Sequence, residues 1–148
     1  MDFYGKVHFV DADDLIDRLS AYGVYITEGK ILLIQDPRSL RWELPGGGIE
    51  SGEAIRQGLT REFAEEAGMT VVGKPNLLTE WTEYFFDVTS AQAWRSKRQF
   101  YMVSEVRGNL LVNGNGDDSA TARLVPLNEI KDLTITQSVR KVIKVAAG

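Results

Sequence analysis

The stretch "GGIESGEAIRQGLTREFAEEAGM", residues 47–69, decides the fold of this chain. It predicts a helix over residues 52–67 with Ser51 as its N-cap, because serine side chains accept the unpaired N–H groups at a helix start. Glu53 falls in the first turn, where the helix dipole favours a negative charge. Gly68 fits the left-handed conformation that commonly ends a helix. We therefore expect a glycine-rich loop followed by a helix.

Three glutamates crowd the second half of this expected helix: Glu62, Glu65 and Glu66. Like charges one turn apart repel by about a few tenths of a kcal/mol per pair. At about 100° of rotation per residue, Glu62 and Glu66 fall on the apolar arc of the helix. The apolar residues of that arc are Ile55, Leu59 and Phe63. Charged groups rarely occupy such an arc unless they are paired or bind a metal, so the pattern favours a cation site over a solvated helix face.

The residue types around these acids indicate which cation it would be. Carboxylates without His or Cys partners favour a hard ion, Mg²⁺ or Mn²⁺, which usually works together with phosphate oxygens. Arg61 precedes Glu65 by one turn and is expected to pair with it. The run Pro45–Gly48 lets the backbone approach a ligand closely. Gly58 either marks a close approach of another group to the helix or is a tolerated glycine packed against a strand.

Together these residues resemble the Nudix box, G-x5-E-x7-R-E-U-x-E-E-x-G-U, in which U is a bulky apolar residue. The matching positions keep every spacing: Gly47, Glu53, Arg61, Glu62, Phe63, Glu65, Glu66, Gly68 and Met69. The preceding "WELPGGGIESGE" and the later "ARLVPLNEI" also resemble the family, the second less specifically. The chain is thus similar to the MutT-like Nudix hydrolases over nearly its whole length.

The resemblance implies an α/β fold, an α/β/α sandwich around a mixed β-sheet. It implies Mg²⁺- or Mn²⁺-dependent hydrolysis of a diphosphate bond in a nucleoside diphosphate linked to another moiety. Carried over by position, the metal-binding and catalytic acids are Glu62, Glu65 and Glu66. A main-chain carbonyl ligand is implied at Gly47 or its neighbour Gly46. Mainly structural roles are implied for Gly47, Glu53, Arg61 and Gly68.

Many family members add an acid from outside the box as a metal ligand or catalytic base. Asp118 is the first candidate and Asp117 the second, because both precede "ARLVPL" in a glycine-rich segment. Glu105 and Glu83 are rivals. For each of these acids taken singly, an ordinary solvated role stays open.

Substrate contacts are expected outside the box, and the candidates are Arg38, Arg41, Tyr84, Trp94 and Arg98. The two arginines just before the box are placed to meet phosphate. Tyr84 belongs to an aromatic strand, where stacking on a base competes with core packing. The aromatic and basic segment 94–98 either binds phosphate and base or forms an exposed hairpin tip.

Composition bounds the class of protein. The chain has 148 residues, 43% hydrophobic and 26% charged, which suits a single globular domain over residues 1–148. Its net charge of −4 argues against a nucleic-acid partner, which needs a basic surface. It has no cysteine, which excludes thiolate chemistry, and its one histidine is His8. With no signal peptide or bilayer-spanning apolar run, no membrane partner is expected, and the cytoplasm is the expected location.

Patterns outside the box predict the remaining elements. We expect strands at 21–27, 30–36, 70–75, 76–89 and 99–106, and a short strand leading into a turn at 123–130. A short helix or turn is expected at 11–19, and irregular segments at 37–52, 90–98 and 107–122. Residues 136–147 carry apolar side chains at helical spacing, which predicts an amphipathic closing helix. Strands interleaved with two helices are typical of an α/β sandwich.

The leading hypothesis is a pyrophosphohydrolase that acts on a small nucleotide substrate. A second hypothesis is hydrolysis of a 5′-triphosphate or cap on RNA, which segment 94–98 supports and the negative net charge opposes. A third is a Nudix-fold nucleotide sensor without catalysis, although sensors typically have a degraded box and this box is intact. A homodimer is a further expectation from the family resemblance.

Overall fold

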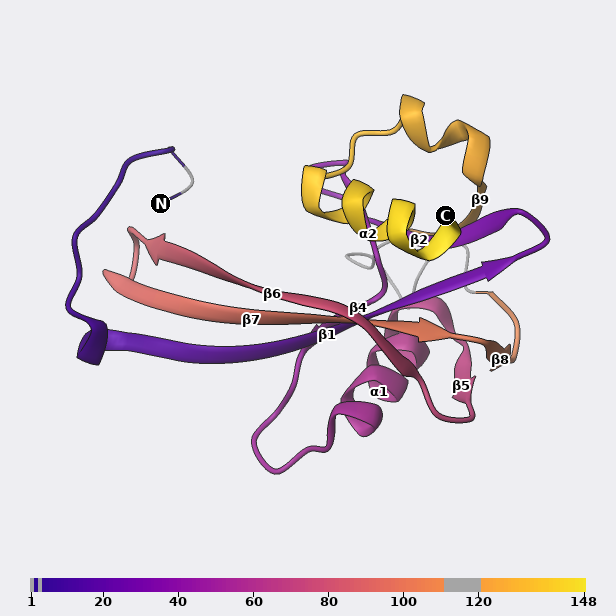
Figure 1. Ribbon diagram of the computed structural model, residues 1–148, viewed down its shortest axis with the longest axis horizontal. Coiled ribbons are helices and arrows are strands. Elements are labelled where there is room, and N and C mark those ends of the chain that lie inside the picture. The colour runs from indigo at the N-terminus through magenta and orange to yellow at the C-terminus, as the bar shows by residue number, and fades with distance from the viewer. Residues whose placement is uncertain (1, 3, 111–120) are drawn as a thin grey trace.

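Figure 1 shows the computed structural model, which describes residues 2, 4–110 and 121–148. A twisted sheet of long strands lies between two helices in the described residues, α1 (Ile55–Ala67) on one face and α2 (Gln137–Ala147) on the other (Figure 1). The predicted α/β/α sandwich is therefore confirmed. No helix in the described part of the chain is long and apolar enough to cross a membrane.

The main sheet has seven strands within the described residues. They are β1 (Leu15–Thr27), β2 (Lys30–Gln35), β3 (Trp42–Glu43), β4 (Gly46–Gly48), β6 (Asn76–Asp87), β7 (Gln92–Val103) and β9 (Thr121–Pro126). A small separate sheet pairs β5 (Thr70–Val72) with β8 (Glu105–Arg107). The 3-10 turns are η1 (Ala12–Asp14) before β1 and η2 (Leu127–Asp132) after β9. Strands β1 and β7 run parallel and their other described neighbours pair antiparallel, so the sheet is mixed, as predicted.

Strand β1 divides the sheet. One of its edges pairs with β7 from Leu15 to Tyr25. The other edge pairs first with β4 over residues 20–22 and then with β2 at residues 26–27. Because β4 and β2 follow one another on this edge, the sheet splits between them. The glycines of β4 and the short β3 therefore lie beside the split.

Apolar side chains bury on both faces of the sheet. Under α2 the core contains Val24, Phe100, Val139, Val142 and Ile143. Against α1 it contains Ala21, Leu32, Leu59, Phe63 and Ala67. Gly23 allows the close approach of α1, because a Cβ at this position would overlap the Phe63 ring. This packing fixes the distance between α1 and β1.

Helix α1 begins later than the sequence pattern predicts. Its N-cap is Ala54, whose N–H donates to Gln57 Oε1 at 2.9 Å, so the prediction of Ser51 as N-cap is wrong. Glu53 lies before the helix instead of in its first turn. A tertiary contact explains why Glu53 stays outside the helix. Its carboxylate is held by the guanidinium of Arg61, which lies in the second turn of α1.

Two loops predicted from the sequence contain strand. Segment 90–98 was expected to be irregular, but β7 begins at Gln92. Segment 11–19 contains a 3-10 turn, as expected, but continues directly into β1. The short strand β4 lies inside the predicted loop 37–52. The hairpin of β1 and β2 and the closing helix α2 are confirmed.

Candidate active site

The glycine strand β4 lies directly against the acidic side of α1. The N–H of Gly46 donates to Glu66 Oε1 at 2.9 Å, which ties this half-buried acid to the strand. A Cβ at Gly47 would lie 2.7 Å from Glu62 Oε1, so only glycine leaves room for that carboxylate. Gly46 itself has φ 149° and could not carry a side chain without striking the β1 backbone. The glycine run and the acids therefore form one site.

Arg61 connects the loop before α1 to the acids on α1. Its Nε and Nη2 donate to the two oxygens of Glu53 at 2.9 and 3.1 Å, a bidentate pair. Nη2 also donates to Gly48 O at 3.1 Å, and Nη1 donates to Glu62 Oε1 at 3.0 Å. The predicted contact with Glu65 exists at 3.5 Å but is the longest of these. Arg61 is thus anchored by Glu53 and orients the cluster through its hydrogen bond to Glu62.

Electrostatics distinguish Glu66 from its neighbours. Burial removes water from its carboxylate and raises the pKa of Glu66 to about 8, although the Gly46 N–H opposes that rise. The negative charges of Glu62 and Glu65 raise it further. A second carboxylate beside a desolvated one is unfavourable without a cation. In contrast, the Arg61 guanidinium lowers the pKa of Glu53, so this acid is fully charged at neutral pH.

The donor set fits a hard divalent ion. Glu62 and Glu66 lie one turn apart on α1 against the glycine backbone of β4, and the residues that line the adjacent cavity include no Met, Cys or His. Within the described residues, no three His, Asp or Glu side chains already form a group that could hold a metal. Two carboxylates are fewer oxygen ligands than Mg²⁺ takes, so an ion bound there would need further oxygen ligands.

A cavity of about 340 Å³ opens beside these acids at the split in the sheet. Its polar wall is formed by Arg18, Asp36, Glu43 and Glu66. Its other lining residues are Tyr22, Ile34, Pro37, Leu44, Gly46 and Gly47. The cavity therefore joins the acid cluster to an aromatic ring, a cation and two further carboxylates. Its volume falls in the range of small-molecule sites, about 300–1,000 Å³.

The Tyr22 ring in this cavity packs against Arg98 of β7. The guanidinium carbon of Arg98 lies 4.7 Å from the Tyr22 ring centroid. Arg98 Nη1 donates to Glu83 Oε1 at 3.2 Å, and the Trp81 indole N–H donates to the same oxygen at 3.0 Å. The Arg98 side chain is only 14% exposed. Arg98, predicted as a substrate contact, thus contacts the Tyr22 ring and is not among the residues that line the cavity.

The other predicted substrate residues lie outside this cavity. Arg38 and Arg41 are exposed on the loop after β2, whose first residues Asp36 and Pro37 form part of the cavity wall. Tyr84 and Trp94 lie near the far end of β6 and β7, where Trp94 pairs with Ile16 of β1. Because Ile16 precedes the β4-paired residues by four to six positions, Trp94 is roughly 13–20 Å along the sheet from the acid cluster.

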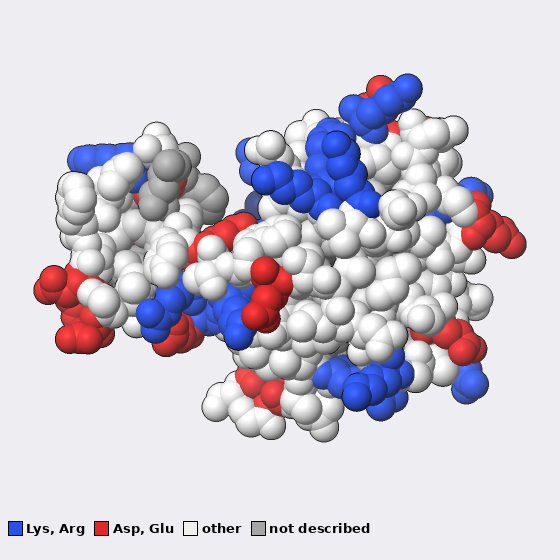
Figure 2. Space-filling view, viewed as in Figure 1, with Lys and Arg blue, Asp and Glu red and all other residues white. Residues whose placement is uncertain are grey.

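The predicted basic patch at 94–98 does not form as a single surface. Alternate residues of a strand face opposite sides, so Trp94 and Arg98 share one face of β7 and Arg95 and Lys97 share the other. Each cation also has an acidic neighbour: Asp17 for Arg95, Glu80 for Lys97 and Glu83 for Arg98. In Figure 2 basic and acidic side chains lie side by side along the long strands.

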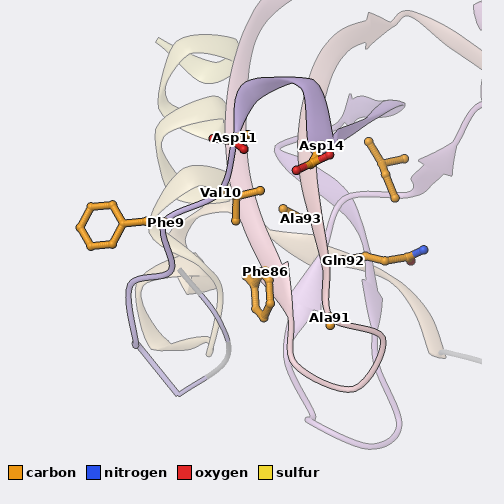
Figure 3. Close-up of a pocket in the computed structure, with 9 residues that line it drawn as sticks. Phe9, Val10, Asp11, Asp14, Phe86, Ala91, Gln92 and Ala93 are labelled. Carbon is orange, nitrogen blue, oxygen red and sulfur yellow. The ribbon is translucent and has the colours of Figure 1, made fainter.

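A larger cavity, about 530 Å³, lies at the distal end of the long strands. Figure 3 shows it between the N-terminal segment and the β6–β7 turn, with Phe9 pointing away from it and Phe86 beside it. Its charged lining residues are Asp11 and Asp14. Acids without a cation repel phosphate, so this cavity is a poorer candidate for a nucleotide than the one beside α1.

The acids proposed outside the box have different surroundings. Asp118 and Asp117 lie outside the described residues. Glu83 accepts hydrogen bonds from Arg98 and Trp81, and Glu105 is exposed on β8. Neither Glu83 nor Glu105 lines the cavity beside the acid cluster.

Sequence reasoning missed the cavity residues supplied by strands β1 and β3. Arg18 and Tyr22 carry no local motif, Glu43 lies in the stretch before the box without a predicted role, and strand pairing brings all three to the cavity. The one available signal was position, because Glu43 lies three residues before the glycine run that approaches the ligand.

Comparison with known proteins agrees with this geometry. A family model described as NUDIX domain matches residues 17–145. YvcI, an uncharacterized Nudix hydrolase of Bacillus subtilis (strain 168), is 28% identical over 109 residues, covering 61% of this chain and 69% of YvcI. The mutator MutT protein from Bacillus halodurans has a TM-score of 0.71 at 24% identity, with 86% of this chain and 80% of that chain covered. At this identity the structural likeness shows the fold.

A shorter match at higher identity links the chain to nucleoside triphosphatase NudI of Escherichia coli O139:H28 (strain E24377A / ETEC). The two are 42% identical over 66 residues, which is 43% of this chain and 43% of NudI. The chain thus matches less than half the length of this relative. The family model, however, spans β1 through α2 and includes the glycine strand and the acids of α1. The chain therefore belongs to the NUDIX domain family, and it is a Nudix hydrolase.

Proposed function

We propose that this protein is a divalent-metal-dependent hydrolase that cleaves a phosphoanhydride bond in a nucleotide or nucleotide derivative. The observation that carries the proposal is the arrangement of Glu62 and Glu66 against the glycine strand, beside a cavity that contains Arg18. A hydrophobic site would not place two neighbouring carboxylates there, and a plain anion site would not either. The similarity to a nucleoside triphosphatase supports a nucleotide substrate.

In this proposal the residues of the site have separate roles in binding the metal, binding phosphate and positioning the acids. Glu62 and Glu66 hold Mg²⁺ or Mn²⁺, with Gly47 or Gly46 offering a carbonyl oxygen. The bound ion supplies positive charge that neutralises the diphosphate as negative charge develops on it. Arg18, which lines the same cavity, binds a phosphate oxygen of the substrate. Arg61 keeps Glu62 in position through its hydrogen bond.

Glu65 would have a more peripheral part in this arrangement. Its side chain is 56% exposed and contacts Arg61 at 3.5 Å. We propose that it joins the acids once metal and phosphate are bound, as the box resemblance implies. Asp118 stays a proposed catalytic base.

The RNA 5′-end hypothesis has less support than a small nucleotide substrate. It depended on a basic surface at segment 94–98, and the cations there are paired with acids. A nucleic-acid backbone needs several unpaired cations along its path. Small nucleotides need only the cavity beside α1.

The test is a phosphate-release panel with Mg²⁺ or Mn²⁺, using NTPs, dNTPs, NDP-sugars, ADP-ribose, dinucleoside polyphosphates and triphosphorylated RNA. We expect turnover of at least one nucleotide, and a loss of about 100-fold or more in Glu66→Gln with an unchanged melting temperature. Glu129→Gln is the control. This exposed acid lies in η2, pairs with Arg123 at 3.7 Å and does not line the cavity. Full activity of Glu66→Gln would remove the metal assignment. Failure of the wild type on every substrate would favour the sensor.

A further inference from the structure

A further cavity lies on the extended part of the sheet and contains two residues that the proposed hydrolysis does not involve. Tyr84 and Trp94, both predicted from the sequence to contact a substrate, line this cavity. We call it the aromatic cavity, because Phe86 lines it as well. Its volume is about 430 Å³, within the range of about 300–1,000 Å³ found for small-molecule sites. Neither α1 nor α2 lies against this part of the sheet (Figure 1), so the cavity is separate from both helix-covered cores.

Strand pairing places several of the lining side chains on one face of the sheet. Tyr84 of β6 pairs with Arg95 of β7. Two residues further along β6, Phe86 pairs with Ala93. Ala93 also pairs, on its other edge, with Leu15 of β1. Residues directly opposite one another in a sheet share a face, and so do alternate residues of one strand. These side chains therefore form one wall of the aromatic cavity.

The N-terminal segment, residues 4–10, forms the opposite wall and is fixed in place. The His8 ring stacks on Phe86 with 3.9 Å between the ring centroids and 14° between the planes. His8 Nε2 and Asp2 Oδ2 are 2.7 Å apart, and Asp2 is only 7% exposed. Asp2 Oδ1 also accepts the backbone N–H groups of Tyr4 and Lys6. A buried carboxylate thus holds the histidine ring against the sheet, so this wall is formed before any ligand arrives.

Tyr84 is the aromatic side chain of the sheet wall that has surface left for a ligand. One face of the Phe86 ring is already covered by His8. Tyr84 remains 60% exposed, although its backbone pairs within the sheet. Aromatic rings bind one another in offset-stacked or edge-to-face arrangements. A flat aromatic ligand that enters the cavity can therefore stack on Tyr84.

Arg95 determines the charge that such a ligand can carry. Its Nε and Nη2 donate to the two oxygens of Asp17 at 2.6 and 3.0 Å, and Nη1 has no hydrogen bond to another described residue. This nitrogen can donate to one anionic oxygen of a ligand. Asp17 already balances the charge of Arg95, and Asp11 and Asp14 line the adjoining cavity. These carboxylates disfavour a ligand with several negative charges, such as a nucleoside triphosphate.

We propose that the aromatic cavity is a second ligand site, which binds a flat aromatic ring that carries one negative charge. The ring stacks on Tyr84, and its anionic oxygen accepts a hydrogen bond from Arg95 Nη1. The site is roughly 13–20 Å along the sheet from the acid cluster. None of the proposed metal-binding acids lines it, so binding there is independent of the proposed hydrolysis.

The probe is naphthalene-2-sulfonate, a flat aromatic ring with one negative charge, titrated into the full chain by calorimetry. EDTA is present, so that no metal ion draws the sulfonate to the acid cluster. We expect saturable binding at one site. Methanesulfonate, which lacks the ring, should bind about tenfold more weakly or worse. The same is expected of 2-naphthol, which lacks the charge, and of ATP, which carries several.

Two variants test the two parts of the site. Tyr84→Ala should weaken binding of the sulfonate by about fivefold or more, because the stacking ring is removed. Arg95→Gln should weaken the sulfonate by about tenfold or more and change the binding of 2-naphthol by less than about twofold. Both side chains are exposed, so unchanged melting temperatures are expected.

Each variant has a matched control. Lys97→Gln also removes a cation and an ion pair from β7, that with Glu80 at 3.7 Å, but Lys97 does not line the aromatic cavity. Phe9→Ala removes a 99% exposed ring from the N-terminal segment that does not line the aromatic cavity and points away from the adjoining one (Figure 3). Both controls should bind the sulfonate within about twofold of the wild type.

Backbone amide shifts locate the bound probe. Naphthalene-2-sulfonate should shift amides of residues 84–86 and 93–95 and leave those of residues 46–48 and 62–66 unchanged. The proposal is overturned if the probe does not bind, if Tyr84→Ala or Arg95→Gln binds it like the wild type, or if either control weakens it equally. ATP binding in this cavity more tightly than the sulfonate would also overturn it.

Glu66→Gln separates the second site from the proposed hydrolysis. This variant should lose nucleotide turnover and still bind naphthalene-2-sulfonate like the wild type, because Glu66 does not line the aromatic cavity. Loss of sulfonate binding in Glu66→Gln would place the probe at the acid cluster and reject the second site. Full turnover in Glu66→Gln together with normal sulfonate binding would reject the metal assignment and retain the second site.

Discussion

A single arginine organises the acidic end of the site. The Arg61 guanidinium contacts Glu53, Glu62 and Glu65 as well as the carbonyl oxygen of Gly48, and its side chain is 26% exposed. These contacts raise the pKa of Arg61, with the Glu53 hydrogen bond as the main cause. Arg61 therefore stays charged under all ordinary conditions, and the acids around it determine how the site responds to pH.

We predict that Glu53 contributes to stability at neutral pH and that acid removes this contribution. The Arg61 hydrogen bond lowers the pKa of Glu53 from its ordinary 4.5 in the folded state. The folded state thus binds this proton less readily than the unfolded state, so the contribution is present above pH 4.5 and lost as the pH falls through the lowered value. The difference in unfolding free energy between wild type and Glu53→Gln should shrink as the pH falls from 6 to 3, measured in urea titrations.

The control for this titration is Glu50→Gln. Glu50 is 71% exposed and lies 4.0 Å from Arg61, so its ion pair contributes little. A pH-independent difference for Glu53→Gln would contradict the pairing. An equally large effect in Glu50→Gln would show general charge repulsion instead.

At the scale of elements, the helix was predictable because its pattern is local. The wheel placed Glu62 and Glu66 on the arc of Leu59 and Phe63, and in the structure both apolar residues are fully buried while the acids flank β4. The strand at 92–98 was missed because it extends beyond both helices. Polar side chains are tolerated on both of its faces there, so no apolar alternation marks it.

The cavity could not be predicted for a related reason. Arg18, Tyr22 and Glu43 come from separate strands, and pairing of β1 with β4 and of β3 with β2 brings them together. The spacing of residues within one strand cannot predict which residues of another strand will lie beside them. The sequence therefore predicted the acids and the glycine run, which belong to one motif, and not the cavity residues that come from β1 and β3.

The packing of α1 against the loop before it depends on Gly58. We predict that alanine at this position lowers the stability of the protein. A Cβ there would lie 2.5 Å from Ile49 Cδ1 and 2.8 Å from Glu53 Oε1. Alanine favours a helix by up to about 1 kcal/mol over glycine. We nevertheless expect Gly58→Ala to lower the unfolding free energy, by about 1–3 kcal/mol, because the Ile49 and Glu53 side chains must move and Glu53 would loosen its pair with Arg61.

Thr60→Ala gives the comparison within the same helix. Thr60 donates its hydroxyl to Arg56 O and lies outside the loop contact, so the substitution should be neutral or slightly stabilising in thermal melts. A stabilised Gly58→Ala would show that the glycine is merely tolerated. The close approach of loop 49–53 to α1 would then have no energetic role.

For the whole molecule, the long strands extend well beyond the two helices. The part of β1, β6 and β7 near the N-terminal segment has neither helix against it, whereas the part near residues 20–25 is packed on both faces (Figure 1). Exposed side chains are frequent at this end, and Phe9 is 99% and Tyr84 60% exposed. The molecule thus combines a well-packed body with a thinly covered extension.

We predict that this difference appears in native-state hydrogen exchange. Backbone amides of residues 15–17 and 93–95 should exchange at least tenfold faster than those of residues 21–25 and 99–103, although both sets belong to the same paired strands. Strand ends protected by few apolar contacts open locally without global unfolding. Equal protection along β1 and β7 would contradict the prediction and indicate that the extension opens only with the body.

The parallel pairing of β1 with β7 also has a consequence for biosynthesis. Tyr25 is matched with Val103, so one central strand stays without its neighbour on the ribosome until most of the polypeptide has emerged. Contacts between such distant parts of a chain form late and slow the folding reaction. During that interval the nascent strand exposes apolar side chains that chaperones recognise, so translation speed across the second half of the message becomes a determinant of yield.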